Sequence, residues 1–300
     1  MSEPQVESVK LGELNCWKIR TAQCELLVAQ QGAHVLSYQR NGEQPLIWLN
    51  DHAVFKQGTP IRAGVPVCWP WFGNLARNPQ SVQAMRQSSE AAPAHGLVRA
   101  LDWELLGIQQ SAEGVTVEFT VPQAGKGELP GWAHKVDVRL SLLLGEGLQI
   151  SLTSHNLDDH AVSLSQALHS YFSVSDVRSV TAEGLDGLDY IETLEDWQQR
   201  HQAGDLQFTG ETDRIYLQTP AELGILDPDW NRRIKLTSAG SASTVVWNPW
   251  TGRAAQLSDM ADDGWQQMLC IETANVLDDA VDLAPGASHT LSITICAEKL

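Results

Sequence analysis

Two side chains of this 300-residue sequence have types and surroundings that suit proton transfer, one imidazole and one carboxylate. The imidazole is that of His169, at the end of segment 162–169, where apolar residues alternate with small or polar ones. Alternate side chains of a strand point to opposite faces. His169 then shares a face with Ser163, Ser165 and Ala167, a small and polar surface of the kind that lines a cleft. A strand-end histidine can also be purely structural, and the spacing leaves both readings open.

The carboxylate is that of Glu272, which stands in the apolar segment 268–275. Burying a carboxylate is costly unless partners compensate it. Such a residue is either half of an ion pair with an arginine in the core or a group whose pKa is adjusted for acid–base work. The local sequence does not choose between these readings.

Two further polar residues stand near turns. His95 directly precedes Gly96, so we expect it in a turn, close to the backbone and beside a ligand cavity. Asp213, together with Arg214, precedes a short apolar pair. That pattern is typical of a turn that enters a strand, and it would also suit a polar site.

Residues 59–99 form the stretch best suited to line a binding site. Its first part, 59–73, contains three prolines and two glycines, so it can be neither a helix nor a central strand. The stretch carries four arginines and several large aromatic residues, and aromatic groups are seldom left exposed on a loop without a function. We therefore expect it to form the wall of a cavity that accepts a ligand.

The charge balance restricts the class of ligand. The sequence carries 37 acidic and 20 basic side chains, a net charge of −17 at pH 7, and no lysine or arginine cluster offsets it. Such a surface repels polyanions, so we expect no nucleic acid and no membrane partner. An anionic small molecule would have to be held by a few local arginines.

The cysteines and the first residues predict a cytoplasmic protein. There are five cysteines, an odd number without a CxxC pair, as expected of buried reduced thiols. The first residues are polar and acidic, unlike a signal peptide, and no run approaches the ~20 apolar residues of a membrane helix. We expect a bacterial-type enzyme that is a monomer.

Motifs for cofactors and for other catalytic classes are missing from the sequence. It contains no HxH or HxxxH, so it predicts no local metal site, although a distributed site stays possible in an all-β fold. It contains no GxGxxG or Walker motif for a nucleotide and no nucleophile elbow. No Asp/Glu pair stands out as the two carboxylates of a glycosidase. We therefore predict neither a cofactor nor a metal.

Most of the chain alternates with period two, which predicts an all-β fold. Asn41-Gly42 is a hairpin signal, and short helices are expected only near 81–90 and 194–202. Many short antiparallel strands predict a large sandwich or barrel, and no linker or repeat divides residues 1–300, so we expect a single domain. The strand-like segments are 24–29, 34–39, 46–49, 115–121, 136–144, 148–152, 162–168 and 291–295.

Five segments, taken together and in this order, resemble the aldose 1-epimerase (mutarotase) superfamily, and within it the glucose-6-phosphate 1-epimerase branch. They are 60–73, 95–99, 168–172, 212–216 and 270–272, spread over nearly the whole chain. The resemblance implies a large antiparallel β-supersandwich of the galactose mutarotase type. It also implies an isomerase that interconverts the α and β anomers of a hexose 6-phosphate without a cofactor.

The resemblance also implies roles for the residues named above. Glu272 would be the catalytic carboxylate and His169 the catalytic histidine, with His95 as a second active-site histidine. Because ring opening needs a proton removed from the C1 hydroxyl and one delivered to the ring oxygen, we expect Glu272 to be the base and His169 the acid. Asp213 would hold sugar hydroxyls. The other substrate-binding residues would be two arginines at the phosphate and two aromatic residues at the sugar face, namely Arg62, Arg99, Trp71 and Phe72. Whether Arg77 joins the phosphate site is open.

The chain departs from the family pattern at two positions. Ala63 stands where the family loop commonly has glycine, which adds a methyl group where the backbone would approach the ligand or need an unusual conformation. Leu97 stands where an aromatic residue is usual, so one packing or ligand contact would be lost. Two other functions fit the same residues, a mutarotase for unphosphorylated aldoses and a non-catalytic carbohydrate-binding protein.

Overall fold

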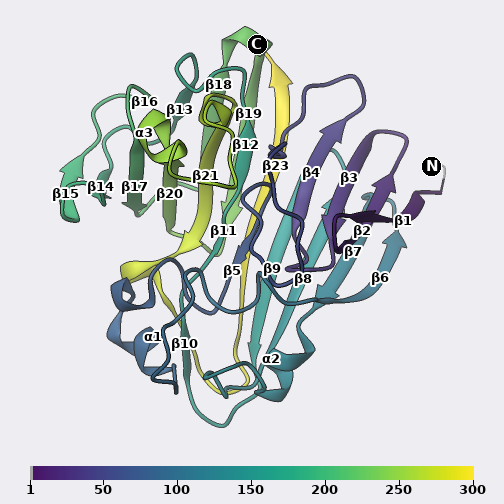
Figure 1. The fold of residues 1–300 in the computed structure, drawn as a ribbon, viewed down its shortest axis with the longest axis vertical. Coiled ribbons are helices and arrows are strands. Elements are labelled where there is room, and N and C mark those ends of the chain that lie inside the picture. Colours follow the sequence, from purple (N-terminus) through teal and green to yellow (C-terminus); the bar gives the residue numbers. More distant parts are fainter. Residues whose placement is uncertain (1–2) are drawn as a thin grey trace.

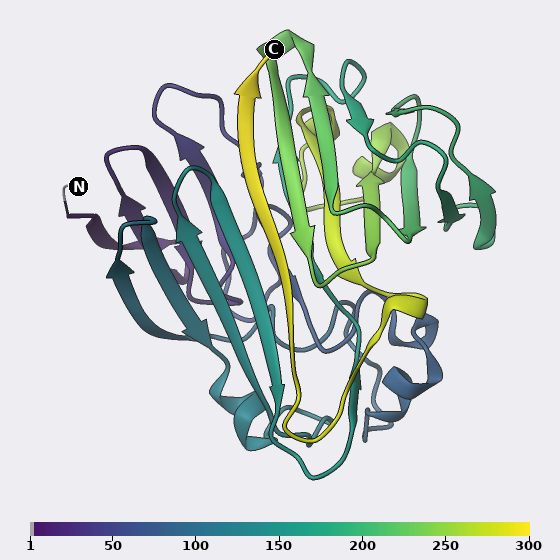
Figure 2. The ribbon, with the colours of Figure 1, turned by 180° about the vertical axis from the view of Figure 1, so that it is seen from behind.

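The computed structural model describes residues 3–300 and consists mainly of antiparallel strands arranged in two layers (Figure 1). A nine-stranded sheet forms one continuous layer, seen best from behind (Figure 2). The opposite layer contains a four-stranded and an eight-stranded sheet. The main core lies between the layers. The prediction of a large antiparallel β-sandwich with few short helices is confirmed.

The nine-stranded sheet contains, in spatial order, β16 (Leu206–Gln207), β13 (Thr181–Glu183), β18 (Glu222–Asp227), β19 (Arg232–Ala239), β23 (Ser288–Lys299), β9 (Leu148–Asn156), β8 (Val136–Leu144), β7 (Val115–Thr120) and β6 (Glu104–Gln110). The eight-stranded sheet contains β15 (Gln198–His201), β14 (Asp189–Glu192), β17 (Thr212–Leu217), β20 (Ser243–Asn248), β21 (Met268–Asn275), β11 (Gln166–Leu168) and β5 (Val67–Cys68), with β12 (Tyr171–Ser173) also paired to β21.

The smaller elements complete the two layers. The four-stranded sheet contains β1 (Gln5–Leu11), β2 (Leu14–Arg20), β3 (Cys24–Ala29) and β4 (Val35–Arg40), and a separate pair joins β10 (Val162–Leu164) to β22 (Val281–Leu283). The α-helices are α1 (Gln80–Ala84), α2 (Pro122–Lys126) and α3 (Trp250–Ala254), and the 3-10 turns are Leu75–Arg77, Pro228–Trp230, Gly264–Gln267 and Leu277–Asp279. Within residues 3–300 no helix has the length and apolar character that crossing a membrane requires.

Alternation in β8 and β9 produces one apolar face. Every second residue of both strands is buried, while most of those between are half-buried or exposed. The register aligns buried residues of the two strands, for example Leu140 with Leu152. Their apolar side chains therefore face the opposite layer together, which removes apolar surface from water.

Segment 162–168 forms two strands in different sheets instead of the single strand expected. Ser165 separates β10 from β11, because its N–H donates to the carbonyl of Pro70 (3.1 Å) and its hydroxyl donates to Asn78 (2.6 Å). The same hydroxyl accepts the N–H of Phe72 (2.9 Å). The break thus anchors the 59–99 stretch to the sheet.

Three other predictions about local structure were wrong. Segment 194–202 contains strand β15 in place of a helix, because Asp196 and Trp197 have positive φ (53° and 61°), which an α-helix excludes. Segment 46–49 makes only an isolated bridge between Ile47 and Phe172. Asn41-Gly42 does form a turn, but no regular strand follows it to complete a hairpin.

The 59–99 stretch is mostly irregular, as predicted, and its first part, 61–71, is almost entirely buried. Its one strand, β5, lies at the edge of the eight-stranded sheet. Gly64 is tied to its neighbours on both sides, since its N–H donates to the carbonyl of Trp48 and its carbonyl accepts the N–H of Tyr171, both at 2.9 Å. Ala63, by contrast, is fully buried in the main core. The methyl group that replaces the family glycine therefore fills core space.

Gly64→Ala should be strongly destabilising, whereas Gly42→Ala should cost little. Both glycines have positive φ (67° and 78°), but an added Cβ would lie 2.1 Å from the Val35 carbonyl oxygen at Gly64 and meets nothing within 4 Å at Gly42. Left-handed backbone costs an alanine about 1–2 kcal/mol at either position. Urea unfolding should show that loss for Gly42→Ala and about 3 kcal/mol or more for Gly64→Ala; equal losses would contradict the collision.

Candidate active site

A cavity of about 460 Å³ opens on the outer face of the eight-stranded sheet, a volume suited to a small ligand. Its floor comes from β17, β20 and β21 and from the residues between β11 and β12. Its walls come from three irregular segments, 72–78 with His95, 193–197 and 253–257. The predicted wall from the 59–99 stretch is therefore present, and two other segments complete it.

The cross-strand register brings the histidine and the glutamate together. Leu168 of β11 pairs with Thr273 of β21, so the next step of the ladder places His169 opposite Glu272. On the other side Glu272 pairs with Val245, which pairs with Ile215. All four side chains of this row line the cavity. The face predicted for His169 holds for Ala167, which lies on the same side of the sheet, but not for Ser163, which stands on β10 in another sheet.

Glu272 and His169 are each other's main polar partners. His169 Nε2 lies 3.4 Å from Glu272 Oε1, and the two side chains are 12% and 1% exposed. No arginine pairs with Glu272 in residues 3–300, so of the two readings the core ion pair is not observed. Glu272 Oε2 and His169 Nδ1 are buried without a hydrogen-bond partner in the same part of the chain. Buried polar atoms without partners are costly, which is typical of sites that a ligand completes.

Burial sets the protonation of this pair. It raises the pKa of Glu272 well above its usual value, and the charge of Asp213 raises it further. It lowers the pKa of His169 well below its usual value, and the positive charges of Arg99 and Arg62 act in the same direction. The substrate-free pair therefore favours a neutral carboxylic acid beside a neutral imidazole. It holds one transferable proton, on the carboxyl group of Glu272.

His95 is held as a neutral hydrogen-bond donor. It has a positive φ (63°), as expected of the predicted turn, and its ring lies 5.4 Å from that of His169. The N–H of Gly73 donates to His95 Nδ1 (3.3 Å), so the neutral ring carries its proton on Nε2. Burial lowers the pKa of His95 to about 3. The tautomer thus leaves an N–H for a ligand oxygen.

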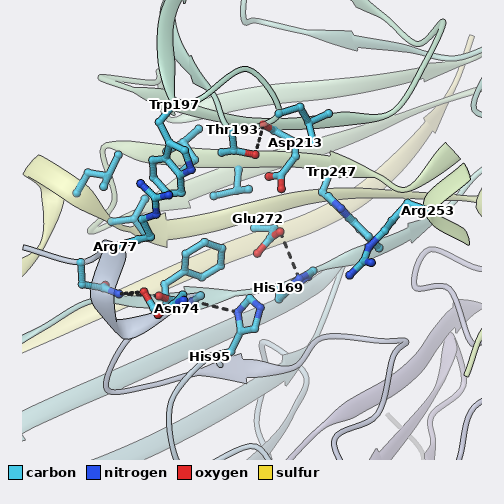
Figure 3. A pocket seen from close by; sticks show the side chains of 18 of the residues that line it. Asn74, Arg77, His95, His169, Thr193, Trp197, Asp213, Trp247, Arg253 and Glu272 are labelled. Atoms are coloured by element: carbon cyan, nitrogen blue, oxygen red, sulfur yellow. Dashed lines mark hydrogen bonds and ion pairs between the residues drawn. The ribbon is translucent and has the colours of Figure 1, made fainter. Parts of the chain in front are cut away.

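Asp213 lies across the sheet from the pair, on β17, where it is opposite Trp247 of β20. Its carboxylate lines the cavity (Figure 3). Burial raises its pKa to about 6, and the nearby charges of Glu192 and Glu211 contribute in the same direction. A carboxylate with this pKa is ionised at neutral pH and ready to accept hydroxyl hydrogens.

The structure distributes the arginines differently from the sequence prediction. Arg62 lines the cavity, and its Nε forms an ion pair with Asp259 (2.9 Å). Arg99 does not line it; instead its Nη2 donates to the carbonyl of Ala94 (2.8 Å). Arg77 and Arg253 both line the cavity. Figure 3 shows these two on opposite sides of the Glu272–His169 pair.

The aromatic residues of the cavity are also only partly those predicted. Phe72 lines it and packs edge-on against His95, with ring centres 5.0 Å apart. Trp71 faces the core, where its indole N–H donates to the carbonyl of Pro93 (2.9 Å). Trp197 and Trp247 line the cavity instead, one in a turn and one on β20.

The local sequence carries no signal for most of the cavity residues that it failed to predict. The departure at Leu97 has no consequence in the cavity, because that residue packs against the core. Trp197 stacks under Arg77, with the guanidinium carbon 4.9 Å from the ring centre, although 120 residues of sequence separate them. Trp247 could have been found from the alternation in 243–248, which places it beside Val245 on the face of Glu272.

Comparisons with known proteins agree with the geometry. A profile of the family described as Aldose 1-epimerase matches residues 15–296. A protein of Escherichia coli (strain K12), named "Putative glucose-6-phosphate 1-epimerase", is 33% identical over 90% of this chain and 86% of its own length. A Salmonella typhimurium protein of the same name is 31% identical over 99% and 95%.

Solved structures give the same result for the fold. A crystal structure from Salmonella typhimurium, described as a "putative mutarotase", superposes with a TM-score of 0.87 at 30% identity, over 98% of this chain and 94% of that one. A galactose 1-epimerase from Lactobacillus acidophilus has a TM-score of 0.73 over 99% of each chain, at 12% identity. The second likeness shows the fold alone, the galactose mutarotase type that the resemblance implied.

Asp213→Asn should stabilise the protein at neutral pH and have little effect near pH 4. The folded-state pKa of Asp213 is raised from 3.8 to about 6. Ionisation of Asp213 therefore lowers the free energy of unfolding as the pH rises between those values, and the loss stays constant at higher pH. This pKa difference corresponds to ~3 kcal/mol, and partial exposure of the side chain reduces the expected gain to about 1–2 kcal/mol. Unfolding by urea at pH 7.5 and pH 4 measures it. An equal gain at both values would mean that the carboxylate charge is not the cause.

Proposed function

The chain belongs to the aldose 1-epimerase family, and we propose that it interconverts the α and β anomers of a hexose 6-phosphate by acid–base opening and closure of the sugar ring. The observation that carries the proposal is the isolated Glu272–His169 pair on the floor of a cavity lined by arginines. Two relatives that cover nearly the whole chain carry names of glucose-6-phosphate 1-epimerases, which supports this substrate.

Anomer exchange needs two proton transfers and no redox step. Glu272 removes the proton of the C1 hydroxyl while His169 delivers a proton to the ring oxygen, and the C1–O5 bond breaks to give the open aldehyde. Rotation about the C1–C2 bond presents the other face of the carbonyl. His169 then takes back the proton of the O5 hydroxyl and Glu272 returns a proton to O1, which closes the ring as the other anomer.

The electrostatics of the site favour this direction of transfer. In the substrate-free pair the proton rests on Glu272, and its transfer to His169 prepares the pair for the closed sugar, which then meets Glu272 as a carboxylate and His169 as an imidazolium. After ring opening both groups are neutral again. Burial raises the pKa of Glu272 and lowers that of His169, so it favours the neutral pair that accompanies the open sugar. Each group is then a stronger base or acid than it would be in water, and positioned proton transfer of this kind typically contributes ~10²–10⁴-fold.

Other residues of the cavity orient the sugar. The Nε2–H of His95 donates to the ring oxygen or a neighbouring hydroxyl, because its Nδ1 already accepts the Gly73 N–H. Asp213 accepts hydrogen bonds from sugar hydroxyls. Phe72, Trp197 and Trp247 offer aromatic faces for the apolar side of the pyranose.

The phosphate meets arginines of the cavity wall. In a chain of net charge −17 three arginines line one small cavity, Arg62, Arg77 and Arg253. The Arg77 side chain makes no ion pair in residues 3–300 and is stacked on Trp197, so its charge is free for an anion. Arg62 is fixed in place by Asp259. Guanidinium groups suit phosphate oxygens, and we assign the binding of the phosphate to Arg62 and Arg77 in place of Arg99.

Glu272→Gln and His169→Asn should each slow anomer exchange at least about 100-fold without unfolding the protein. Glu272→Gln keeps the side-chain shape, His169→Asn replaces the imidazole with a smaller polar group, and each removes one proton-transfer group. NMR exchange between the anomers of glucose 6-phosphate measures the rate above the spontaneous background, with circular dichroism as the test of folding. His201→Asn, a change at an exposed histidine that does not line the cavity, is the control. Retained activity in either active-site variant would refute the proton-transfer roles of Glu272 and His169.

Arg77→Ala and Arg62→Ala should raise KM for glucose 6-phosphate about tenfold or more and leave KM for glucose nearly unchanged. A charge-assisted hydrogen bond to phosphate is worth ~1.5–3 kcal/mol, which corresponds to roughly 10–150-fold. Arg139→Ala, at an exposed position on β8, is the control for lost positive charge. Equal changes for both sugars would favour a mutarotase for unphosphorylated aldoses. Sugar binding by the unaltered protein without faster anomer exchange would leave only a carbohydrate-binding protein.

A further inference from the structure

Three potential metal-binding side chains meet at one end of the sandwich, away from the cavity. They are His134, in the segment that enters β8, and Asp158 and His160, in the turn between β9 and β10. None of them lines the cavity described above. His134 is buried, Asp158 is half-buried and the His160 side chain is 52% exposed. The group therefore has a fixed inner side and one side open to solvent.

The facing atoms of this group are all lone-pair donors. His134 Nε2 donates to the carbonyl of Met85 (2.9 Å), which leaves its Nδ1 unprotonated when the ring is neutral. His160 Nδ1 contacts a carboxylate oxygen of Asp159 (3.2 Å), which leaves its Nε2 unprotonated in the same way. These two nitrogens face each other at 3.1 Å. Oxygen Oδ2 of Asp158 lies 3.8 Å from the first and 3.7 Å from the second. With these tautomers the three facing atoms are all acceptors, and a cation between them would satisfy all three.

The spacing fits a transition-metal ion. In a tetrahedral site with bonds of ~2.0–2.2 Å, neighbouring ligand atoms are about 3.4 Å apart. The three observed separations, 3.1, 3.7 and 3.8 Å, lie on either side of that value. Two imidazoles and one carboxylate form a ligand set typical of zinc, with the fourth position left to water.

The surroundings hold the three groups in place. Each imidazole has its second nitrogen bound, one by a backbone carbonyl and one by a carboxylate, as is usual for metal-bound histidines. Asp158 Oδ2 accepts the N–H of Lys135 (2.8 Å). Asn156 closes the turn, since its Oδ1 accepts the N–H of Asp158 (2.9 Å) and its Nδ2 donates to the carbonyl of His160 (2.8 Å).

We propose that His134, Asp158 and His160 bind one divalent transition-metal ion, with zinc as the preferred ion and water in the fourth position. The ion joins the β9–β10 turn to the segment that enters β8, and through Met85 to the end of α1. The spacing rules applied to the sequence miss this site, because 26 residues separate the two histidines and the three ligands come from two turns. The negative net charge of the chain favours cation binding at an open turn.

Titration of metal-free, untagged protein with Co²⁺ tests the proposal. One equivalent should produce the intense visible absorption of tetrahedral cobalt, and Zn²⁺ should displace it, whereas Ca²⁺ and Mg²⁺ should not, since they prefer oxygen ligands. Zn²⁺ should also raise the melting temperature, because a ligand of the native state stabilises it.

The variants His160→Gln and Asp158→Asn should each lower the Co²⁺ affinity at least about 100-fold and abolish the melting shift, while epimerase activity stays unchanged. His160 is largely exposed, and an asparagine at 158 still accepts the Lys135 N–H, so both variants should fold. The control is His201→Gln, because His201 and Asp189 form an exposed pair (2.9 Å) without a third ligand. The proposal would be overturned if Co²⁺ gave no tetrahedral spectrum at one equivalent, or if His160→Gln left that spectrum intact. The contact between the two imidazoles would then be a shared proton.

Discussion

Glu272 lies opposite His169 across one step of the β21 ladder, and neither side chain has another strong polar partner. The site depends on this buried contact. Water would return both pKa values toward their usual range, so the pair is useful only while the surrounding structure keeps it dry. Ile215 and Val245 exclude water on one side of the pair. The ring of Tyr171, which is stacked on His169, excludes it on the other side. A protein interior thus supplies what the chemistry needs by excluding solvent from two ordinary side chains.

The irregular 59–99 stretch is ordered because the sheets hold its backbone. Gly64 bonds to Trp48 and Tyr171, and the Gly96 backbone runs so close to Trp69 that a Cβ there would lie 2.0 Å from its carbonyl oxygen. These contacts fix the neighbouring residues, Arg62 on one side and His95 on the other. Hydrogen bonds and close packing therefore fix the backbone of the stretch next to the residues that line the cavity, and its glycines leave the room that this packing needs.

Local periodicity was enough to predict most of the strands and to single out His169 and Glu272, whose catalytic roles came only from the resemblance to a family. Alternation in 136–144 is a local signal that the structure confirms, and so is the side of the sheet on which Ala167 lies. Periodicity could not predict the positions of Arg99 and Trp71, because a side chain in an irregular loop can turn toward the core or the cavity with no change in the pattern of residues. The 194–202 segment failed for a related reason, since its positive φ values arise from a turn that the composition does not mark.

The floor and the rim of the cavity are built by different means, and this affects how the protein can change over evolution. The floor residues are tied to each other by strand register, so a slip of one residue would remove both proton-transfer groups together. The rim residues Arg77, Trp197 and Arg253 stand on separate short segments that do not pair with the floor strands. Replacing one of them alters the substrates that fit without disturbing the reacting pair. A lineage with this architecture can therefore acquire new sugar specificities by single substitutions while it keeps one ancestral reaction.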